Sequence, residues 1–299
     1  MSRRVESFYD RSPQDEWDRM DRHRMEFETT LRAMREFIPP HSAVLDIGGG
    51  PGRYSIELAK AGHRVTLLDL SSGNVELARQ KACDMGVQVD EFIQGNALDL
   101  SRFADATFDA VLLMGPLYHL VEPSDRDRAI LEALRVLAPG GVLFASFITR
   151  YAVYVDLLDL DPGLIARYAR TYERLMSTGV HIPTEQNPGF TDAHFIHPME
   201  IEPLMSGHGL ATLRLAVAEG LIAPVESAVN ALPADLFEAW VDVCYRLGTD
   251  PVIWGAGQHM LYVGRKEKSR PRCAEPRARA VDNRRDLLNH AHRTLRYDN

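Results

Sequence analysis

The sequence has few cysteines and no long apolar run. Its three cysteines, Cys83, Cys244 and Cys273, lie far apart and lack the spacing of a zinc site. We therefore expect no disulfide framework, and the longest apolar stretches, such as residues 109–114, are far too short to cross a bilayer. The first residues also lack the apolar core of a secretory signal, so we expect a cytoplasmic protein that has no membrane partner.

Positive charge is scarce in most of the chain. The formal net charge is −8, but from Arg265 onward 11 Lys and Arg face only 5 Asp and Glu, so the body before Arg265 carries −14. An acidic body argues against a nucleic-acid substrate, because such substrates favour basic surfaces. We expect residues 265–299 to be a basic, disordered tail that is solvated, although a basic tail can also contact a polyanion.

A glycine-rich segment over residues 43–54 dominates the sequence. Val44, Leu45 and Ile47 predict the end of a buried strand, and four glycines then fall within positions 48–52. Neither a strand nor a helix interior tolerates this density of glycine, whereas a turn that brings bare backbone close to a ligand requires it. Because helical spacing resumes after the turn, the segment predicts the first strand, turn and helix of a nucleotide-binding sheet.

The spacing of these glycines indicates which nucleotide is bound. A dinucleotide fingerprint would need its third glycine at Arg53 or Ser55, and no Gly-Lys-Ser/Thr follows, so the NAD, FAD and P-loop alternatives fail. What remains is an acid followed by alternating glycines, Asp46-x-Gly48-x-Gly50-x-Gly52. This pattern resembles motif I of the class I methyltransferases that use S-adenosylmethionine.

Two later segments are similar to the same family. The second predicted strand ends at Asp69, about 20 residues after the glycine turn, where a carboxylate can accept both ribose hydroxyls. The third ends near Asn96, where the family usually has an acid that accepts a hydrogen bond from the adenine amino group. The amide oxygen of Asn96 can still accept that bond, and Asp99 is an alternative.

The fourth predicted strand, residues 108–114, gives the clearest match. Gly115-Pro116 ends it, so Tyr118 and His119 fall on a loop at the carboxyl edge of the sheet, where open α/β sheets bind ligands. In the family this loop faces the sulfonium methyl group. His119 is therefore the candidate general base, because the ordinary pKa of histidine suits that task, although His119 can also simply hydrogen-bond locally. Tyr118 is the candidate residue that orients the acceptor.

The resemblance implies an α/β fold with a seven-stranded, mostly parallel, doubly wound sheet. We expect residues 41–264 to form the methyltransferase domain, with a cap insertion after the fifth strand at about 150–208. Residues 1–40 show helical spacing up to Pro39 and predict a helical lid. Three histidines of the insertion, His181, His194 and His197, match no zinc spacing, so we expect no metal.

We therefore expect methyl transfer from S-adenosylmethionine to an oxygen or nitrogen atom of a small molecule by direct displacement, leaving S-adenosylhomocysteine. The alternative is a methyltransferase-like protein that binds S-adenosylmethionine but catalyses a lyase or cyclase reaction, or regulates. Tyr9 lies in a Tyr-Asp segment that many small-molecule methyltransferases place near the methionine end of the cofactor. The resemblance implies the following cofactor contacts: Tyr9, Asp46, Gly48, Gly49, Gly50, Gly52, Asp69, Leu70, Asn96, Ala97 and Met114.

Overall fold

The computed structural model describes residues 3–185 and 190–267. At its centre lies a sheet whose first five strands run parallel in the order β3-β2-β1-β4-β5. These strands are β1 (Ala43–Ile47), β2 (Arg64–Asp69), β3 (Glu91–Gln94), β4 (Phe108–Leu113) and β5 (Leu137–Thr149). Two antiparallel strands, β9 (His259–Lys266) and β8 (Leu210–Val217), continue the sheet beyond β5.

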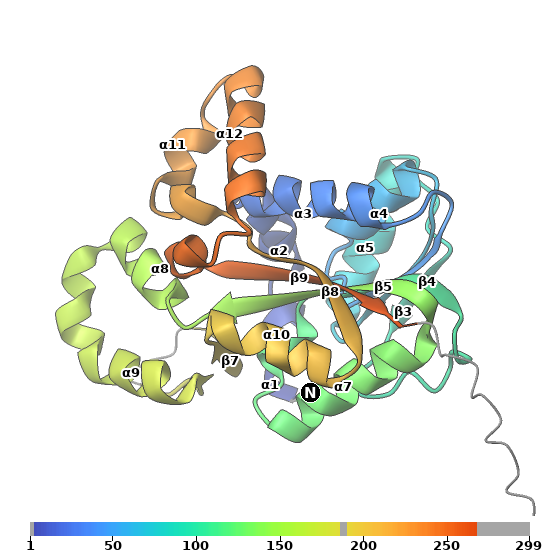
Figure 1. Cartoon of the computed structure of the whole chain (residues 1–299), viewed down its shortest axis with the longest axis horizontal. Helices are drawn as coiled ribbons and strands as arrows, with labels where there is room; N and C mark the ends of the chain where they lie inside the picture. The colour runs from blue at the N-terminus through green and yellow to red at the C-terminus, as the bar shows by residue number, and fades with distance from the viewer. Residues whose placement is uncertain (1–2, 186–189, 268–299) are drawn as a thin grey trace, which may run out of the picture. The chain divides into compact units, whose positions relative to one another are not determined.

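Helices cover both faces of this sheet, as a doubly wound fold requires (Figure 1). One face carries α3 (Arg24–Phe37), α4 (Arg53–Lys60) and α5 (Ser72–Asp84), and the other carries α7 (Pro123–Val136) and α10 (Pro198–Gly207). The strands alternate accordingly, since Val44 packs in the core under α3 while its neighbour Leu45 packs with α7. Burial on both faces explains why these strands are continuous apolar runs.

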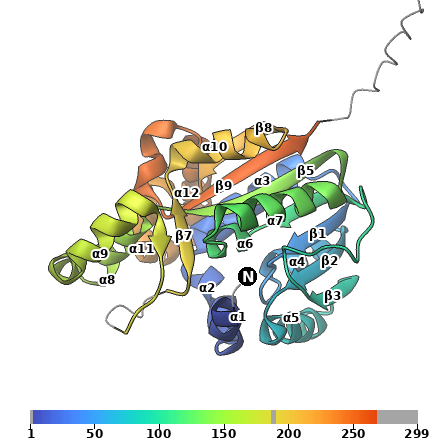
Figure 2. The same ribbon diagram turned by 90° about the horizontal axis from the view of Figure 1, so that it is seen from below.

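The segment after β5 adds a separate wall to the molecule. It holds α8 (Ala152–Leu160), α9 (Ile165–Thr178), β6 (Val180–His181) and β7 (Ala193–Ile196). Strand β7 pairs with the end of β5, so this insertion adds two strands to the seven that were predicted. Figure 2 shows the insertion beside α1 (Arg3–Asp10) and α2 (Pro13–Arg22). The α/β class and the mostly parallel core are confirmed.

Several predicted boundaries are wrong in detail. The N-terminal segment, which was predicted to be a helical lid, consists of three helices, because Pro13 starts α2 and His23 separates α2 from α3. Within the insertion, α8 and α9 are separated at Asp161, whose side chain caps a short 3-10 turn, residues 162–164.

The C-terminal boundary of the sheet also differs from the prediction. Strand β9 continues to Lys266, so residues 265–266 belong to the sheet and not to the basic tail, because they pair with β8. The remaining tail, residues 268–299, lies outside the described residues. The connection from β8 to β9 contains a short helix, α11 (Glu226–Asn230), and a longer one, α12 (Ala234–Leu247).

No described helix is both long and apolar enough to span a bilayer.

Candidate active site

The glycine turn brings bare backbone to the carboxyl edge of the sheet. Gly48, Gly50 and Gly52 all have positive φ angles, of 76°, 54° and 90°, which side chains rarely adopt. A Cβ at Gly49 would lie 2.8 Å from the Asp46 carboxylate and 2.9 Å from Leu67. The backbone conformation of the turn disfavours side chains at Gly48, Gly50 and Gly52, and close packing leaves no room for one at Gly49. The turn therefore requires glycine, as the sequence predicted.

Asp69 is the acid at the end of β2, and it is buried beside this turn. One carboxylate oxygen accepts the backbone N–H of Gly50 at 2.8 Å, and the other accepts that of Ser71 at 2.8 Å and the Asn74 amide at 3.4 Å. Burial raises the pKa of Asp69 to about 6, although these hydrogen bonds oppose the rise. A carboxylate held in this way keeps acceptor capacity for ligand hydroxyls.

These residues line a cavity, which we call the glycine-turn cavity; its empty space, together with the solvent at its mouth, is about 910 Å³. Nine of the predicted cofactor contacts line it, and so do both predicted catalytic residues, Tyr118 and His119. The nine are Tyr9, Asp46, Gly48, Gly49, Gly50, Asp69, Leu70, Ala97 and Met114.

Two predicted contacts do not line the glycine-turn cavity. Gly52 instead lets α4 pack closely on α5, since a Cβ there would lie 3.1 Å from Ala78. The amide oxygen of Asn96 accepts the backbone N–H of Leu98 at 3.0 Å, which closes a local turn. A side chain used in this way is a poorer acceptor for a ligand than the free amide that the sequence suggested.

His119 lies deep in the wall of the glycine-turn cavity. Its Nε2 lies 2.8 Å from the Tyr9 hydroxyl, and its Nδ1 lies 3.1 Å from the backbone oxygen of Asp192. Burial lowers the pKa of His119 to about 4, so the ring is neutral near pH 7. Nδ1–H therefore donates to Asp192, and Nε2 accepts from Tyr9, which holds the tyrosine in a fixed position.

A second cavity, the insertion cavity, lies under the segment that follows β5, and its empty space, together with the solvent at its mouth, is about 1,590 Å³. Its walls come mainly from α8, α9 and the β6–β7 hairpin, and they are largely apolar and aromatic. The two cavities share four lining residues, Tyr9, Glu16, Arg19 and Tyr118. They therefore meet at the loop that was predicted to face the reacting methyl group.

Sequence reasoning missed the charged residues at this junction. Arg19 donates to the carboxylate of Glu26 at 2.8 and 3.3 Å and to that of Glu16 at 3.2 Å. Burial opposes ionisation of Glu26, but Arg19 and the nearby His259 outweigh it and lower the pKa of Glu26 to about 2. In the sequence these residues belong to an ordinary charged helix, and only the fold turns them toward the cavities.

The glycine-turn cavity fits S-adenosylmethionine. The backbone over 48–50 offers close approach, and the Asp69 carboxylate faces a site that ribose hydroxyls can fill. Leu68, Leu70 and Ala97 add an apolar lining for a flat base. A buried oxygen of Asp46 also has no hydrogen-bond partner among the described residues, so the cavity still offers a polar acceptor.

Comparison with known proteins agrees with this geometry. Residues 44–141 match the family model described as a methyltransferase domain. They form a class I methyltransferase domain. The family that the glycine pattern predicted is confirmed, together with S-adenosylmethionine as its cofactor.

The similar curated proteins are methyltransferases. A ubiquinone biosynthesis O-methyltransferase of Xanthomonas axonopodis pv. citri is 33% identical over 172 residues, which are 58% of this chain and 64% of the relative. A tRNA 5-carboxymethoxyuridine methyltransferase of Escherichia coli is 36% identical over 118 residues, 39% of this chain and 44% of the relative. The chain thus spans less than two thirds of the length of these relatives.

Solved structures share the fold of the methyltransferase domain. A SAM-dependent methyltransferase from Methanosarcina mazei aligns with a TM-score of 0.55 at 22% identity, covering 79% of this chain and 97% of the other. A 1,6-didemethyltoxoflavin-N1-methyltransferase from Burkholderia thailandensis, solved with S-adenosylhomocysteine, aligns with a TM-score of 0.55 at 16% identity. That alignment covers 88% of this chain and 87% of the other.

Proposed function

We propose that this chain transfers the methyl group of S-adenosylmethionine to an oxygen or nitrogen atom of a small molecule in the insertion cavity. The observation that carries the proposal is the meeting of the two cavities at Tyr9, Glu16, Arg19 and Tyr118. A cofactor on the glycine turn and an acceptor under the insertion would then face each other across these side chains. Direct displacement requires the acceptor atom to lie in line with the C–S bond, which a cofactor and an acceptor in adjoining cavities can satisfy.

The chain's own residues supply position, exclusion of water and control of a proton. The sulfonium is already activated, because its leaving group is a neutral thioether, so the protein needs no further activation of the methyl group. Helices α1 and α2 form the lid over the glycine-turn cavity, since Val5, Tyr9 and Glu16 line it. The side chain of Asp10 secures α1 by accepting from Ser71 at 2.6 Å and from the backbone N–H of Gly73 at 3.1 Å.

The role predicted for His119 as general base stays a prediction, and the geometry favours a positioning role. Both ring nitrogens are hydrogen-bonded, and the ring lines only the glycine-turn cavity. Tyr9 lies between His119 and the junction of the cavities. We propose that His119 fixes Tyr9, and that Tyr9 and Tyr118 flank the methyl group during transfer.

Two features support a small molecule over the nucleic acid that the E. coli relative's name implies for that protein. The described body is acidic, with a net charge of −14 before Arg265. The insertion cavity is also walled by α8, α9 and a hairpin, so it accommodates a compact acceptor better than an extended polyanion.

The test combines cofactor binding with a search for methylated products. Titration calorimetry should show one site per chain for both S-adenosylmethionine and S-adenosylhomocysteine. Incubation with methyl-labelled S-adenosylmethionine and panels of phenols, carboxylic acids, amines and transfer RNA should then label a small acceptor. Binding without label transfer to any panel would favour the non-methylating alternative, and label in RNA alone would refute the small-molecule assignment.

A further inference from the structure

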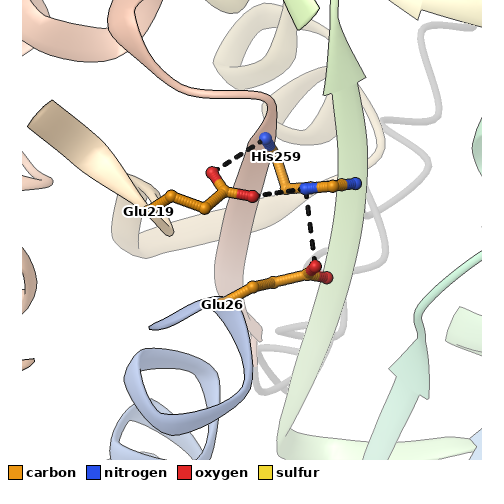
Figure 3. A group of neighbouring side chains, drawn as sticks. All are labelled: Glu26, Glu219 and His259. Carbon is orange, nitrogen blue, oxygen red and sulfur yellow. Dashed lines mark hydrogen bonds and ion pairs between the residues drawn. The ribbon is translucent and has the colours of Figure 1, made fainter. Parts of the chain in front are cut away.

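The polar end of the insertion cavity holds a histidine that the sequence did not single out. His259 begins β9, and its ring lines this cavity. Its Nδ1 hydrogen-bonds the carboxylate of Glu219 and lies 3.5 Å from a carboxylate oxygen of Glu26 (Figure 3). Because Nδ1 faces two carboxylates, it carries a hydrogen, and the proton chemistry of the ring is left to Nε2.

Glu219 is fixed in place, which fixes the ring. Its side chain is fully buried, and its second oxygen accepts the backbone N–H groups of Gln258 at 3.3 Å and His259 at 3.1 Å. In Figure 3 the second ring nitrogen of His259 points away from both carboxylates. Among residues 3–185 and 190–267 no hydrogen-bond partner of Nε2 is found, so this atom is available to a ligand in the insertion cavity.

The charges around His259 keep its ring protonated near neutral pH. Burial alone would lower the pKa of His259, but Glu26 and Glu219 outweigh it and raise the pKa to about 9, with Arg19 opposing them. The His23 ring lies 6.3 Å away, between centroids, and is paired with Glu226. Other charged side chains that line the same cavity are those of Glu16 and Asp156.

The walls of the insertion cavity indicate what would lie against this histidine. Six Phe and Tyr side chains line it, and aliphatic residues from β5, α8 and α9 fill the space between them. A flat, apolar ring packs well in such surroundings. The six are Tyr9, Tyr118, Tyr168, Tyr172, Phe190 and Phe195.

We infer that the acceptor is an aromatic compound with a hydroxyl group, and that His259, oriented by Glu219, donates its Nε2–H to that oxygen and stabilises it as a phenolate. The inference rests on the proposed function and deepens it. The O–H bond breaks as the hydroxyl proton leaves to solvent, and the phenolate oxygen accepts a hydrogen bond from the imidazolium. The phenolate oxygen then bonds to the methyl carbon, and the electrons of the broken C–S bond go to sulfur.

The other histidine of the site, His119, does not suit this role. Stabilising a phenolate requires a positive charge beside its oxygen. The raised pKa of His259, about 9, keeps its ring charged near neutral pH, whereas burial lowers the pKa of His119 to about 4 and leaves its ring neutral. His119 also has no free ring nitrogen among its described contacts.

A metal ion is the rival use of the same three side chains. One atom each from Glu26, Glu219 and His259 lies within 4.8 Å of the others. However, Arg19 already donates to both oxygens of Glu26, and Glu219 is occupied by His259 and two backbone N–H groups. The group is thus internally paired, which favours an imidazolium held by carboxylates over a cation site.

The test uses 4-nitrophenol, whose phenolate absorbs visibly and whose ionisation can be followed without turnover. The full chain is titrated from acid to alkaline pH with this probe, with and without saturating S-adenosylhomocysteine. The wild-type protein should ionise the bound phenol below the midpoint of the free phenol, because an imidazolium faces it. In His259→Gln the surrounding carboxylates should move the midpoint above that of the free phenol, with roughly tenfold less phenolate at a given pH.

Two further variants keep the experiment decisive. Glu219→Gln retains the hydrogen bond to Nδ1 but removes the charge of the carboxylate. Like His259→Gln, it should raise the ionisation midpoint of the bound phenol above the wild-type value, but by a smaller amount. His208→Gln makes the same substitution far from both cavities, where His208 pairs with Asp127, and should behave as wild type. Circular dichroism checks that each variant is folded.

Three results would overturn the assignment. They are no phenolate bound by wild type, an equal midpoint in wild type and His259→Gln, and one Mn²⁺ or Zn²⁺ per chain that is lost in His259→Gln. Failure of the proposed function is recognised separately, since the wild-type protein would then bind neither S-adenosylmethionine nor S-adenosylhomocysteine.

Discussion

The pairing of His259 with two carboxylates predicts how stability depends on pH. The pKa of His259 is raised from 6.5 to about 9 in the folded chain. A group whose folded pKa lies above its unfolded value stabilises the fold fully below the unfolded pKa, and this stabilisation is lost as pH rises through the folded pKa. At about 1.4 kcal/mol for each tenfold change, the rise is equivalent to about 3 kcal/mol.

The perturbation is His259→Gln, and the measurement is urea unfolding followed by circular dichroism. The variant leaves Glu26 and Glu219 without their cation, so it should be less stable than wild type near pH 6. Near pH 9.5 the wild-type imidazole is mostly neutral as well, and the difference between the two proteins should shrink by about 3 kcal/mol. Comparing the two proteins cancels the contributions of other titrating groups, such as Asp46, whose pKa burial raises to about 7.

The control is again His208→Gln. The difference between its free energy of unfolding and that of wild type should change far less between these two pH values. A stability difference between wild type and His259→Gln that is the same at both pH values would show that the ring is neutral in the fold. The ion pair with Glu26 and Glu219 would then be refuted, together with the reasoning built on it.

Three other predictions concern the cofactor half. Asp69→Ala should weaken S-adenosylhomocysteine binding by roughly 100-fold in calorimetry, because two charge-assisted hydrogen bonds are lost; unchanged affinity would refute the ribose assignment. Gly49→Ala should lower the free energy of unfolding in urea by about 1–3 kcal/mol, since its Cβ meets Asp46 and Leu67, whereas Gly207→Ala, with nothing within 4 Å, should not. His119→Ala should slow transfer roughly tenfold through loss of one hydrogen bond to Tyr9, with the shape of the pH-rate profile unchanged above pH 6; a new alkaline limb would instead favour His119 as the base.

The cofactor half could be predicted well because its signals are local. The glycine turn and Asp69 lie within one strand-turn-helix-strand unit, and β1 pairs with β2 in parallel. Chain geometry alone then brings the acid to Gly50. The prediction was weaker for Asn96, because its role depends on whether the amide is already used by a local turn, which composition does not reveal.

The boundaries of the insertion were harder to predict for a related reason. A Pro-rich segment between two helical patterns gave no sign that β7 would pair with the end of β5. Such pairing depends on which strand edge is open in the folded sheet. The aromatic residues of α9 were therefore visible in the sequence as a helix face, but their position on a cavity wall was not.

By itself the sequence determined the α/β sheet, the glycine turn, the family and its cofactor, since each depends on residues close together in the chain. Only the tertiary structure decided what surrounds the acceptor. Glu26, Glu219 and His259 come from three distant segments and meet at one end of a cavity. Each is unremarkable in its own segment, and its ionisation is set by neighbours that folding brings within hydrogen-bond reach.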